Sequence, residues 1–397
     1  MLHIYIDLST FFSLFAKQMK IILAIDSFKG SLTSLEAEQA VAETIIQHFP
    51  KSIVSLIPIA DGGEGTLSVL LHTSRGSYRH LQAHNPCMEI TPTYYGISAD
   101  KQTAYIEMAA ISGLPLLKEH QKNPMKTTTF GTGELIKDAL EKGCTHFIIG
   151  IGGSATNDAG TGMLQALGYR FYDKAGKELG TGGEVIGKIA RIESSNRHPL
   201  LANAHFTVAC DVQNPFYGPQ GAAHVFARQK GANNEMIQQL DEGMKAFAQV
   251  IQQHTGKDIS QLPGSGAAGG LGGCLAAFMN ADLKSGAELL LQATGFYDCI
   301  ANANLIITGE GKIDKQSLMG KITGKILEEG KQRGIPVIAL TGLAEDIDLL
   351  KKAGFAGIHP ITEAGFQPLK EAMKPAIAKR NLKITVSKII SNYLNCD

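Results

Sequence analysis

The sequence predicts an α/β protein with two α/β domains: a doubly wound, Rossmann/flavodoxin-like parallel sheet domain with a second α/β domain inserted into it. First, apolar, β-rich runs alternate with amphipathic helical runs near both ends of the chain, which is the βαβ order of parallel sheets. Second, several of these runs end in segments that combine glycine with acidic or basic residues, as expected where strand ends share one ligand site. Third, a length of 397 residues suffices for two or more domains.

The first part of the chain shows the βαβ order most clearly. An apolar run predicts a strand, and a serine-capped run with apolar residues on one side predicts a helix. A second apolar run then predicts a parallel strand, which leads into another helix. These four elements are expected at residues 21–25, 34–48, 53–59 and about 66–71.

The middle of the chain begins with a change of pattern. Between Tyr78 and Tyr95 the residues alternate in polarity and two prolines interrupt them, which predicts β-hairpin strands. Further along, an apolar stripe formed by Met236, Leu240 and Met244 predicts a long helix. The other expected elements are strands at 104–108, 145–149, 206–209 and 224–227 and helices at 133–142, 163–167, 234–254 and 271–278.

The βαβ order returns in the last part of the chain. The expected elements are helices at 287–291, 321–333 and 370–394 and strands at 305–307, 336–340 and 357–361. We therefore expect residues 20–78 and 290–397 to form the sheet domain and residues 79–289 to form the inserted domain, with a cleft between the two. A simple end-to-end pair of domains is the alternative.

Composition argues against several classes of partner. The formal net charge is +0 and tryptophan is absent, so we expect no nucleic acid partner. The six cysteines are scattered without a C-x-x-C pair, which argues against zinc and thioredoxin-like motifs and favours a cytoplasmic protein. We expect a monomer or a homodimer with a small-molecule substrate.

The first eighteen residues are atypical. Their apolar patch at residues 11–16 lacks a basic flank and follows Asp7, so it makes a poor signal peptide. It is also too short to span a membrane, and we expect no membrane partner. Because a clear first strand begins just after Met19, we predict that Met19 is the natural start and that residues 1–18 are an extension.

The segment from Gly150 to Gly162 is the most informative motif. It lies between an apolar run and an amphipathic run, so it is typical of a strand, a glycine-rich turn and a helix N-terminus. Such a layout binds anions through free backbone N–H groups. A tight turn that needs glycine for its geometry alone is the other interpretation. The candidate cofactor-binding residues of this turn are Gly152, Gly153, Ser154, Ala155, Thr156 and Asn157.

Four more segments combine glycine with acidic or basic residues, or with small ones, at 26–31, 60–66, 264–270 and 308–314. A single aspartate after a strand is most often a helix cap. Many acids together with lysines instead favour phosphoryl transfer, in which lysines neutralise phosphate charge, carboxylates hold Mg²⁺ and one carboxylate takes a proton from the attacking hydroxyl. The candidate acids and bases are Asp26, Asp61, Glu64, Asp158, Asp211, Glu310, Asp314, Lys29 and Lys312.

Two familiar nucleotide motifs are excluded by context. Gly264, Gly266 and Gly269 have the spacing of a dinucleotide fingerprint, but no strand precedes them and no acid follows at the required distance. The nearest match to a P-loop has Ile189 where a Mg²⁺-binding serine or threonine is required.

Taken together, these motifs resemble the bacterial glycerate kinase family of the glycerate 2-kinase type. The resemblance rests on residues 26–30, 58–66, 150–162, 264–273 and 308–314, in the order shown by that family, and it extends from Met19 to about Ser391. It implies two α/β domains, one inserted in the other. It also implies Mg²⁺-dependent transfer of the ATP γ-phosphoryl group to glycerate, with 2-phosphoglycerate as product.

We assign expected roles on this basis. Asp61 is the expected catalytic base, because its loop is the most acidic and glycine-rich of those that follow a strand. Lys29 and Lys312 are the expected catalytic cations. Substrate binding is assigned to Ser27, Lys29, Gly62, Gly63 and Glu64; nucleotide binding also to Gly266 and Gly269; and Mg²⁺ binding to Asp158, Asp211, Glu310 and Asp314. Ordering of Lys312 is the alternative role of Glu310 and Asp314.

Two other function classes stay open at this point. A NAD(P)-linked hydroxy-acid oxidoreductase would need a glycine fingerprint with its ribose-binding acid, which the chain lacks. A non-catalytic nucleotide sensor could lose its acids, whereas this chain keeps them.

Overall fold

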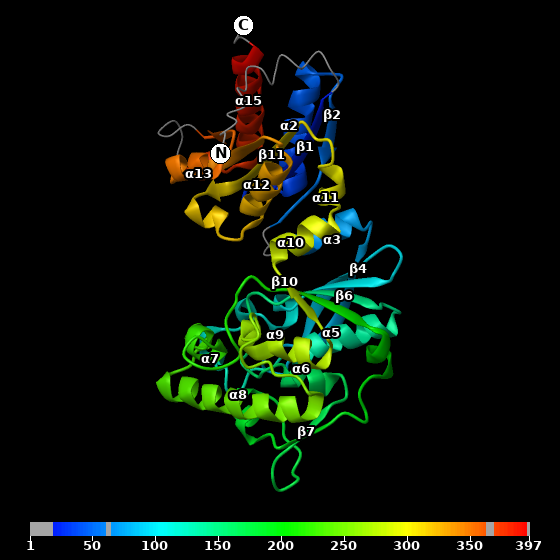
Figure 1. Ribbon diagram of the computed structural model, residues 1–397. Helices are drawn as coiled ribbons and strands as arrows, with labels where there is room; N and C mark the ends of the chain where they lie inside the picture. Colours follow the sequence, from blue (N-terminus) through cyan, green and yellow to red (C-terminus); the bar gives the residue numbers. More distant parts are fainter. Residues whose placement is uncertain (1–18, 61–64, 363–368, 395–397) are drawn as a thin grey trace. The chain divides into compact units, whose positions relative to one another are not determined.

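The computed structural model describes residues 19–60, 65–362 and 369–394. The predicted extension at residues 1–18 lies outside the described residues. The structure is an α/β fold in which two large, separate sheets are flanked by helices, and the predicted fold class is confirmed (Figure 1).

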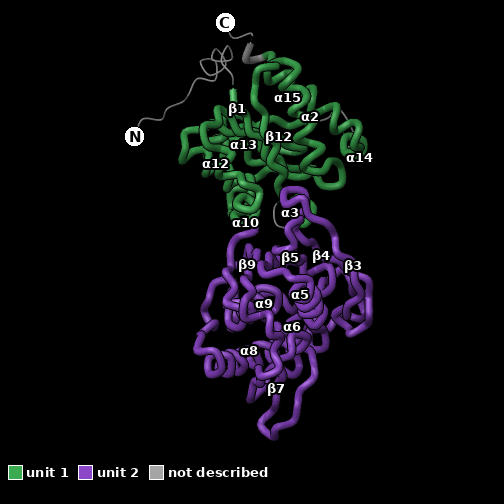
Figure 2. Tube along the Cα trace, turned by 90° about the vertical axis from the view of Figure 1, so that its right-hand side faces the viewer, with its two compact units in different colours: residues 1–69, 287–397 green, residues 70–286 purple. Residues whose placement is uncertain are grey.

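The chain divides into two compact units. The first is formed by residues 1–69 together with 287–397, and the second by residues 70–286 (Figure 2). Each unit has its own sheet and its own hydrophobic core. The second unit therefore interrupts the first in sequence.

Five parallel strands form the sheet of the first unit. Their spatial order is β13-β12-β11-β1-β2, which corresponds in chain order to the 2-1-3-4-5 arrangement of flavodoxin-like sheets. The strands are β1 (Lys20–Ile25), β2 (Ile53–Leu56), β11 (Leu305–Ile313), β12 (Val337–Ala344) and β13 (Gly357–Pro360).

Helices cover both faces of this sheet, as a doubly wound fold requires. α2 (Ser34–His48) and α15 (Pro375–Leu394) pack against each other and share one core with the side chains of Leu305 and Ile307. α12 (Ile322–Arg333) lies on the opposite face, because a Cβ on its Gly330 would be 3.7 Å from the side chain of Ile306, which points away from those of its neighbours in the strand. The remaining helices of this unit are α10 (Gly286–Ala293), α11 (Phe296–Cys299), α13 (Ile347–Ala353) and α14 (Leu369–Ala372), and α3 (Thr66–Thr73) includes residues of both units.

The first turn of α2 holds together the ends of β1 and β2. Ser34 Oγ donates to the carbonyl of Ile25 at 2.6 Å and accepts from the backbone N–H of Ile59 at 3.0 Å. Glu38, which is fully buried, accepts from the N–H of Ile25 at 3.1 Å. Burial raises the pKa of Glu38 from 4.5 to about 9, so at neutral pH its carboxyl is protonated. The helix thus supplies side-chain partners where the two strands diverge.

The sheet of the second unit is mixed. Its order is β10-β9-β6-β5-β4-β3, with antiparallel pairing from β3 to β5 and parallel pairing from β5 to β10. The predicted hairpin is confirmed as β3 and β4. The strands are β3 (Ser77–His84), β4 (Ile90–Ile97), β5 (Thr103–Glu107), β6 (His146–Gly150), β9 (His205–Ala209) and β10 (Asp282–Lys284).

The longest helix of the second unit follows the sequence prediction closely. α8 (Asn234–Thr255) starts at an Asn233 cap, ends at a left-handed Gly256, and buries the predicted stripe of Leu240 and Met244. A short two-stranded sheet, β7 (Arg170–Tyr172) with β8 (Arg191–Glu193), was not expected. The other helices are α4 (Ala109–Ser112), α5 (Phe130–Glu141), α6 (Thr161–Ala166), α7 (Ala222–Phe226) and α9 (Ala267–Phe278).

Three local predictions were wrong. The predicted strand at 224–227 lies in the helix α7 and its end, because a short run with three apolar residues does not distinguish a strand from a buried helix. α2 is capped by Thr33, which forms a capping box with Glu36, and not by a serine. The segment 308–313, expected as a glycine turn, continues β11 because it pairs with β12 up to Ile313.

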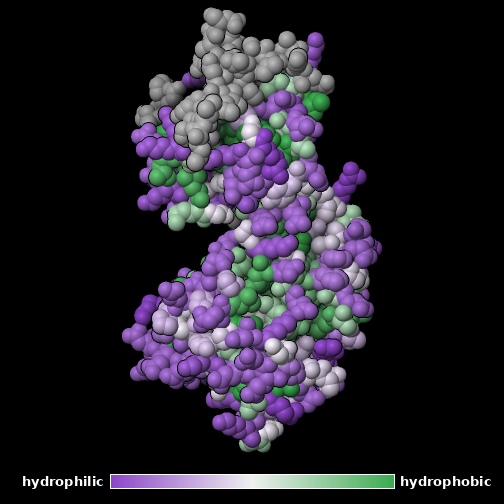
Figure 3. Space-filling view, viewed as in Figure 1, coloured by the Kyte–Doolittle hydropathy of each residue, from purple (hydrophilic) through white to green (hydrophobic). Residues whose placement is uncertain are grey.

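No helix among the described residues is long and apolar enough to cross a membrane. Hydrophilic residues predominate on the face of both units that Figure 3 shows. The described cysteines Cys87, Cys144, Cys210, Cys274 and Cys299 are all free thiols.

We predict that Glu38→Gln makes the stability of the protein less dependent on pH. The wild-type carboxyl is protonated in the fold, so its stabilising contribution is complete below pH 4.5 and is lost as the pH rises toward about 9. A glutamine keeps an acceptor for Ile25 and does not ionise. Between pH 5 and pH 8 the wild type should lose on the order of 3 kcal/mol relative to the variant.

Urea denaturation at the two pH values measures this difference. Glu43→Gln is the matched control, because Glu43 lies on the same helix but is exposed and pairs with Lys383. The control should keep the wild-type pH dependence. The same dependence in Glu38→Gln would contradict the assignment of a protonated buried carboxyl.

Candidate active site

The carboxyl edge of the first unit's sheet contains the switch point of the fold, between β1 and β11. Ligands of doubly wound sheets bind outside the strand ends at such a point, since the chain leaves the two neighbouring strands in opposite directions. The N–H of Asp26 donates to the carbonyl of Gly309 at 2.8 Å, which continues the pairing of β1 with β11 past the last residue of β1. Two segments predicted to carry chemistry, 26–31 and 308–314, are therefore adjacent.

The loop after β1 is compact. Asp26 is buried and its Oδ1 accepts from the N–H of Ser27 at 2.6 Å. The backbone closes on itself where the N–H of Phe28 donates to the carbonyl of Leu32 at 2.9 Å. Lys29 is exposed at the tip of this loop. Its backbone lies close to Gly311, because a Cβ on that glycine would be 3.5 Å from the nitrogen of Lys29.

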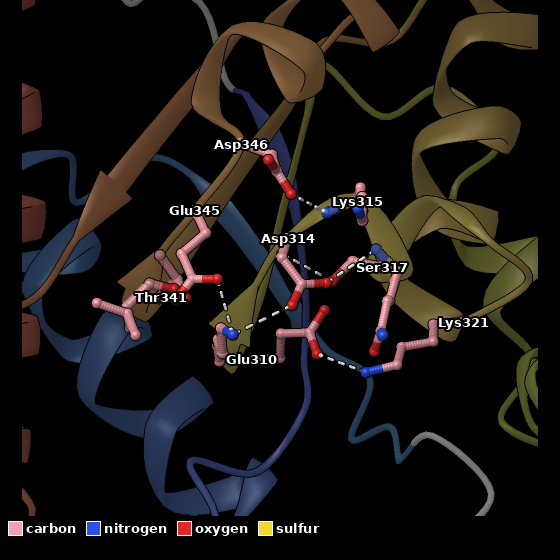
Figure 4. A network of polar contacts seen from close by, with 11 residues as sticks. Glu310, Asp314, Lys315, Ser317, Lys321, Thr341, Glu345 and Asp346 are labelled. Atoms are coloured by element: carbon pink, nitrogen blue, oxygen red, sulfur yellow. Dashed lines mark hydrogen bonds and ion pairs between the residues drawn. The ribbon is translucent and has the colours of Figure 1, made fainter.

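The end of β11 carries a network of carboxylates and lysines (Figure 4). Lys312 Nζ lies 2.9 Å from Glu345 and 3.3 Å from Asp314. Hydrogen bonds to Glu345 and then to Asp314 raise the pKa of Lys312. Glu310 is 7% exposed and lies 3.8 Å from Lys321 Nζ. The predicted Glu310, Lys312 and Asp314 are thus brought together, and sequence reasoning missed Lys321 and Glu345.

Asp314 has a second, structural role in this network. Its Oδ1 accepts from the N–H of Gln316 at 2.8 Å and it caps the 3₁₀ helix at Lys315–Leu318. The backbone N–H of Lys315 donates in turn to Asp346 at 3.3 Å. These contacts fix the chain that follows β11 at the edge of the sheet.

The glycine-rich turn after β6 belongs to the second unit. Gly152 and Gly153 are exposed, whereas Ser154 and the next six residues are buried. The carbonyl of Gly153 accepts from the N–H of Leu114 at 2.9 Å, and the N–H of Ala155 donates to the carbonyl of Ser112 at 2.9 Å. Of the predicted cofactor-binding residues in this turn, two therefore present their backbone to solvent, and the others form the interior that supports it.

Asp158 organises that interior. It is fully buried, and its two oxygens accept five hydrogen bonds, from Thr128 Oγ1, from the N–H and Oγ1 of Thr129, and from the N–H groups of Gly160 and Gly162. Burial raises the pKa of Asp158, although these donors oppose the shift. Its predicted Mg²⁺ role stays a prediction, while its contacts show that it fixes the turn.

Lys230 lies beneath the same turn and was missed by sequence reasoning. It is 1% exposed, and its Nζ donates to Ser154 Oγ and to the carbonyl of Thr156, each at 2.7 Å. Burial lowers the pKa of Lys230 to about 7, and the charge of Asp158 opposes this shift. The sequence holds no signal for this contact, because the bonded residues are 74 and 76 positions away.

The other predicted residues of the second unit have different surroundings. Gly269 is left-handed, and a Cβ there would be 2.2 Å from the carbonyl oxygen of Thr156, so the glycine allows close packing under the turn. A Cβ on the buried Gly266 would be 2.2 Å from the carbonyl oxygen of Pro215. Asp211 follows β9, is exposed, and accepts from the N–H of Gly286 at 2.8 Å.

The predicted base and most of the predicted substrate-binding residues cannot be placed. Asp61, Gly62, Gly63 and Glu64 lie outside the described residues. Among the residues that are described, no group of three or more histidine, cysteine, aspartate or glutamate side chains could hold a metal ion.

We predict that Asp158→Asn destabilises the protein by about 2 to 4 kcal/mol, because an amide cannot accept from all five donors and brings N–H groups against one of them. Urea denaturation measures the loss. Asp211→Asn is the control: an asparagine oxygen still accepts from Gly286, so the change should be within about 1 kcal/mol. Equal losses in the two variants would contradict the organising role of Asp158.

Comparison with known proteins confirms the resemblance drawn from the sequence. The sequence model of the glycerate kinase family matches residues 21–394. A glycerate 2-kinase of Escherichia coli (strain K12) is 42% identical over 376 residues, which cover 93% of this chain and 98% of that protein. A glycerate kinase of Halalkalibacterium halodurans is 44% identical over 322 residues, which cover 81% of this chain and 85% of that protein.

A solved structure agrees with these relatives. The crystal structure of a protein from Salmonella typhimurium LT2, described as a glycerate kinase 2, matches with a TM-score of 0.83 at 39% identity. The match covers 94% of this chain and 100% of that chain. The chain therefore belongs to the glycerate kinase family and is a phosphotransferase with an alcohol group as acceptor.

Proposed function

We propose that this protein is an ATP-dependent glycerate kinase that transfers the γ-phosphoryl group of ATP to D-glycerate, giving 2-phosphoglycerate and ADP. The observation that carries the proposal is the set of lysines and carboxylates at the switch point of the first unit, where Lys29 and Lys312 lie on neighbouring segments. The names of the relatives supply the substrate. The free thiols of the described cysteines support a cytoplasmic location.

The loop after β1 is the proposed substrate site. Lys29 and Ser27 are the residues that would hold the carboxylate of glycerate or the transferring phosphate, since an exposed ammonium and a hydroxyl suit either anion. The compact loop from Phe28 to Leu32 keeps both residues near the end of β11. Lys312, already oriented by Glu345 and Asp314, would offset the negative charge of the phosphates.

The residues at the end of β11 fit a magnesium ion. Mg²⁺ in kinases is typically bound through one or two carboxylates, with substrate phosphates and water completing its shell. Glu310 and Asp314 provide carboxylate oxygens, and the Lys321 ammonium lies close to one of them. These two residues would hold the ion, which when bound neutralises charge on the phosphate oxygens. The assignments of Asp158 and Asp211 stay predictions of the same kind.

Asp61 is the proposed catalytic base. A carboxylate in this role accepts the proton of the 2-hydroxyl of glycerate as the oxygen attacks the γ-phosphorus. Gly62, Gly63 and Glu64 would contact the substrate beside it. The exposed backbone of Gly152 and Gly153 is the proposed contact for nucleotide phosphates, with Ser154 to Asn157 as its support.

We predict that the protein releases ADP from ATP–Mg²⁺ only when D-glycerate is present, and that enolase accepts the product directly. A coupled assay with purified enolase measures both steps. A product that enolase refuses would mean phosphorylation of the 3-hydroxyl and would contradict the stated position. Binding of ATP without ADP release would favour a nucleotide sensor, and binding of NAD(P) would favour an oxidoreductase.

We predict that Asp61→Asn lowers kcat by at least about a hundredfold, because general base catalysis contributes roughly 10²- to 10⁴-fold. The far-UV circular dichroism spectrum should stay that of the wild type. Asp100→Asn, a change at an exposed turn aspartate bonded to Ser98, is the control and should keep wild-type kcat. Near-wild-type turnover in Asp61→Asn would remove Asp61 from the role of base.

A further inference from the structure

A buried lysine lies under the exposed part of the glycine-rich turn. Lys230 reaches this position from the 3₁₀ turn at Arg228–Lys230, and its ammonium contacts Ser154 Oγ and the carbonyl of Thr156. Burying a charged lysine costs free energy, so a lysine in such a place is expected to have a specific role. Here it is bonded to Ser154, which directly follows the exposed Gly152 and Gly153, and to Thr156 two residues later.

The bond from Lys230 to Ser154 also affects the Ser154 hydroxyl, which is itself a hydrogen-bond donor. A hydroxyl that accepts from an ammonium has its own O–H turned away from that ammonium and polarised by it. Ser154 is the residue next to the exposed glycines and is 8% exposed. Its hydroxyl hydrogen is therefore not used in the contact with Lys230, while the bond from Lys230 to the Thr156 carbonyl fixes the following peptide.

We propose that Lys230 is the positioning residue of the Gly152–Gly153 turn: it orients the Ser154 hydroxyl toward an anionic group of a substrate and takes up a proton from solvent when that group binds. The inference rests on the proposed function, because the anion is either the phosphate chain of ATP or the carboxylate of glycerate. The pKa of about 7 for the buried ammonium supports it, since a nearby anion favours the charged form.

Several titratable and charged groups lie near Lys230 and bear on the interpretation of proton uptake. The charge of Asp158 in the turn acts on Lys230. It also acts on Cys274 of α9, where burial and then this charge raise the pKa of the thiol. On its own 3₁₀ turn, Arg228 is bonded to Asn234. On the packed helices α7 and α8, His224 and Asp241 lie 3.7 Å apart and pair with each other. Because Lys230 and Asp158 interact, removal of the lysine amine also changes the electrostatic surroundings of Asp158, whereas removal of the Ser154 hydroxyl leaves both charged groups in place.

Isothermal titration calorimetry of the full chain, in buffers with different ionisation enthalpies, tests the proposal. MgATP and D-glycerate are titrated separately at pH 7.5. One ligand should bind with uptake of about half a proton or more per site, and the uptake should vanish in Lys230→Met. In steady-state assays the same variant should raise KM for that ligand roughly ten- to hundredfold, with a smaller effect on KM for the other substrate.

Two further variants complete the design. Lys257→Met is the matched control, because Lys257 also donates to a backbone carbonyl, that of Ala276, but toward the end of α9 remote from the turn; it should keep the uptake. Ser154→Ala replaces Lys230→Met if the latter does not fold, and removes one acceptor of the ammonium. It should lower the pH at which uptake is greatest, because the charged lysine is less stabilised.

The outcomes separate this inference from the proposed function. Uptake with MgATP alone identifies a nucleotide phosphate as the anion, and uptake with glycerate alone identifies the carboxylate. No uptake with either ligand, uptake retained in Lys230→Met, or an unshifted optimum in Ser154→Ala would overturn the role of Lys230. Wild-type turnover of ATP and glycerate in the same preparation would show that the proposed function itself still stands.

Discussion

The parallel pairing of β1 with β11 is the interaction on which the candidate site depends. It joins residues that are 284 positions apart in sequence, from Ile21 with Leu305 to Ile25 with Gly309. Parallel strands need a long connection, and here that connection includes the whole second unit. The N–H of Asp26 extends the pairing by one bond, which places the loop with Lys29 beside the segment with Glu310 and Lys312. Without this register the lysines and carboxylates would not share one edge.

Buried polar side chains give both candidate regions their geometry. In the first unit, Ser34 and the protonated Glu38 provide hydrogen-bond partners for the backbone where β1 and β2 separate. In the second unit, Asp158 and Lys230 provide them inside the glycine-rich turn. Such groups cost free energy when buried, and their hydrogen bonds to the backbone offset part of that cost and favour one backbone conformation.

Local pattern predicted much of the fold, and long-range contact decided the rest. The stripe of α8 and the alternation of β3 and β4 repeat over enough residues to be unambiguous. Gly309 and Gly311 indicated a turn in the sequence, but a Cβ on Gly309 would be 2.1 Å from the carbonyl oxygen of Leu340, so this glycine serves the close approach of β12. Lys230 carried no local signal, because only the tertiary fold brings it to Ser154.

The central claim is that the carboxyl edge of the first unit, at the β1–β11 switch point, binds the reactants. Hydrogen–deuterium exchange followed by mass spectrometry, with and without MgATP and D-glycerate, tests it directly. The account predicts slower exchange in peptides that cover residues 26–32 and 308–314, and unchanged exchange in β7 and β8. Unchanged exchange in both of the first peptides, at ligand concentrations that support turnover, would contradict the claim.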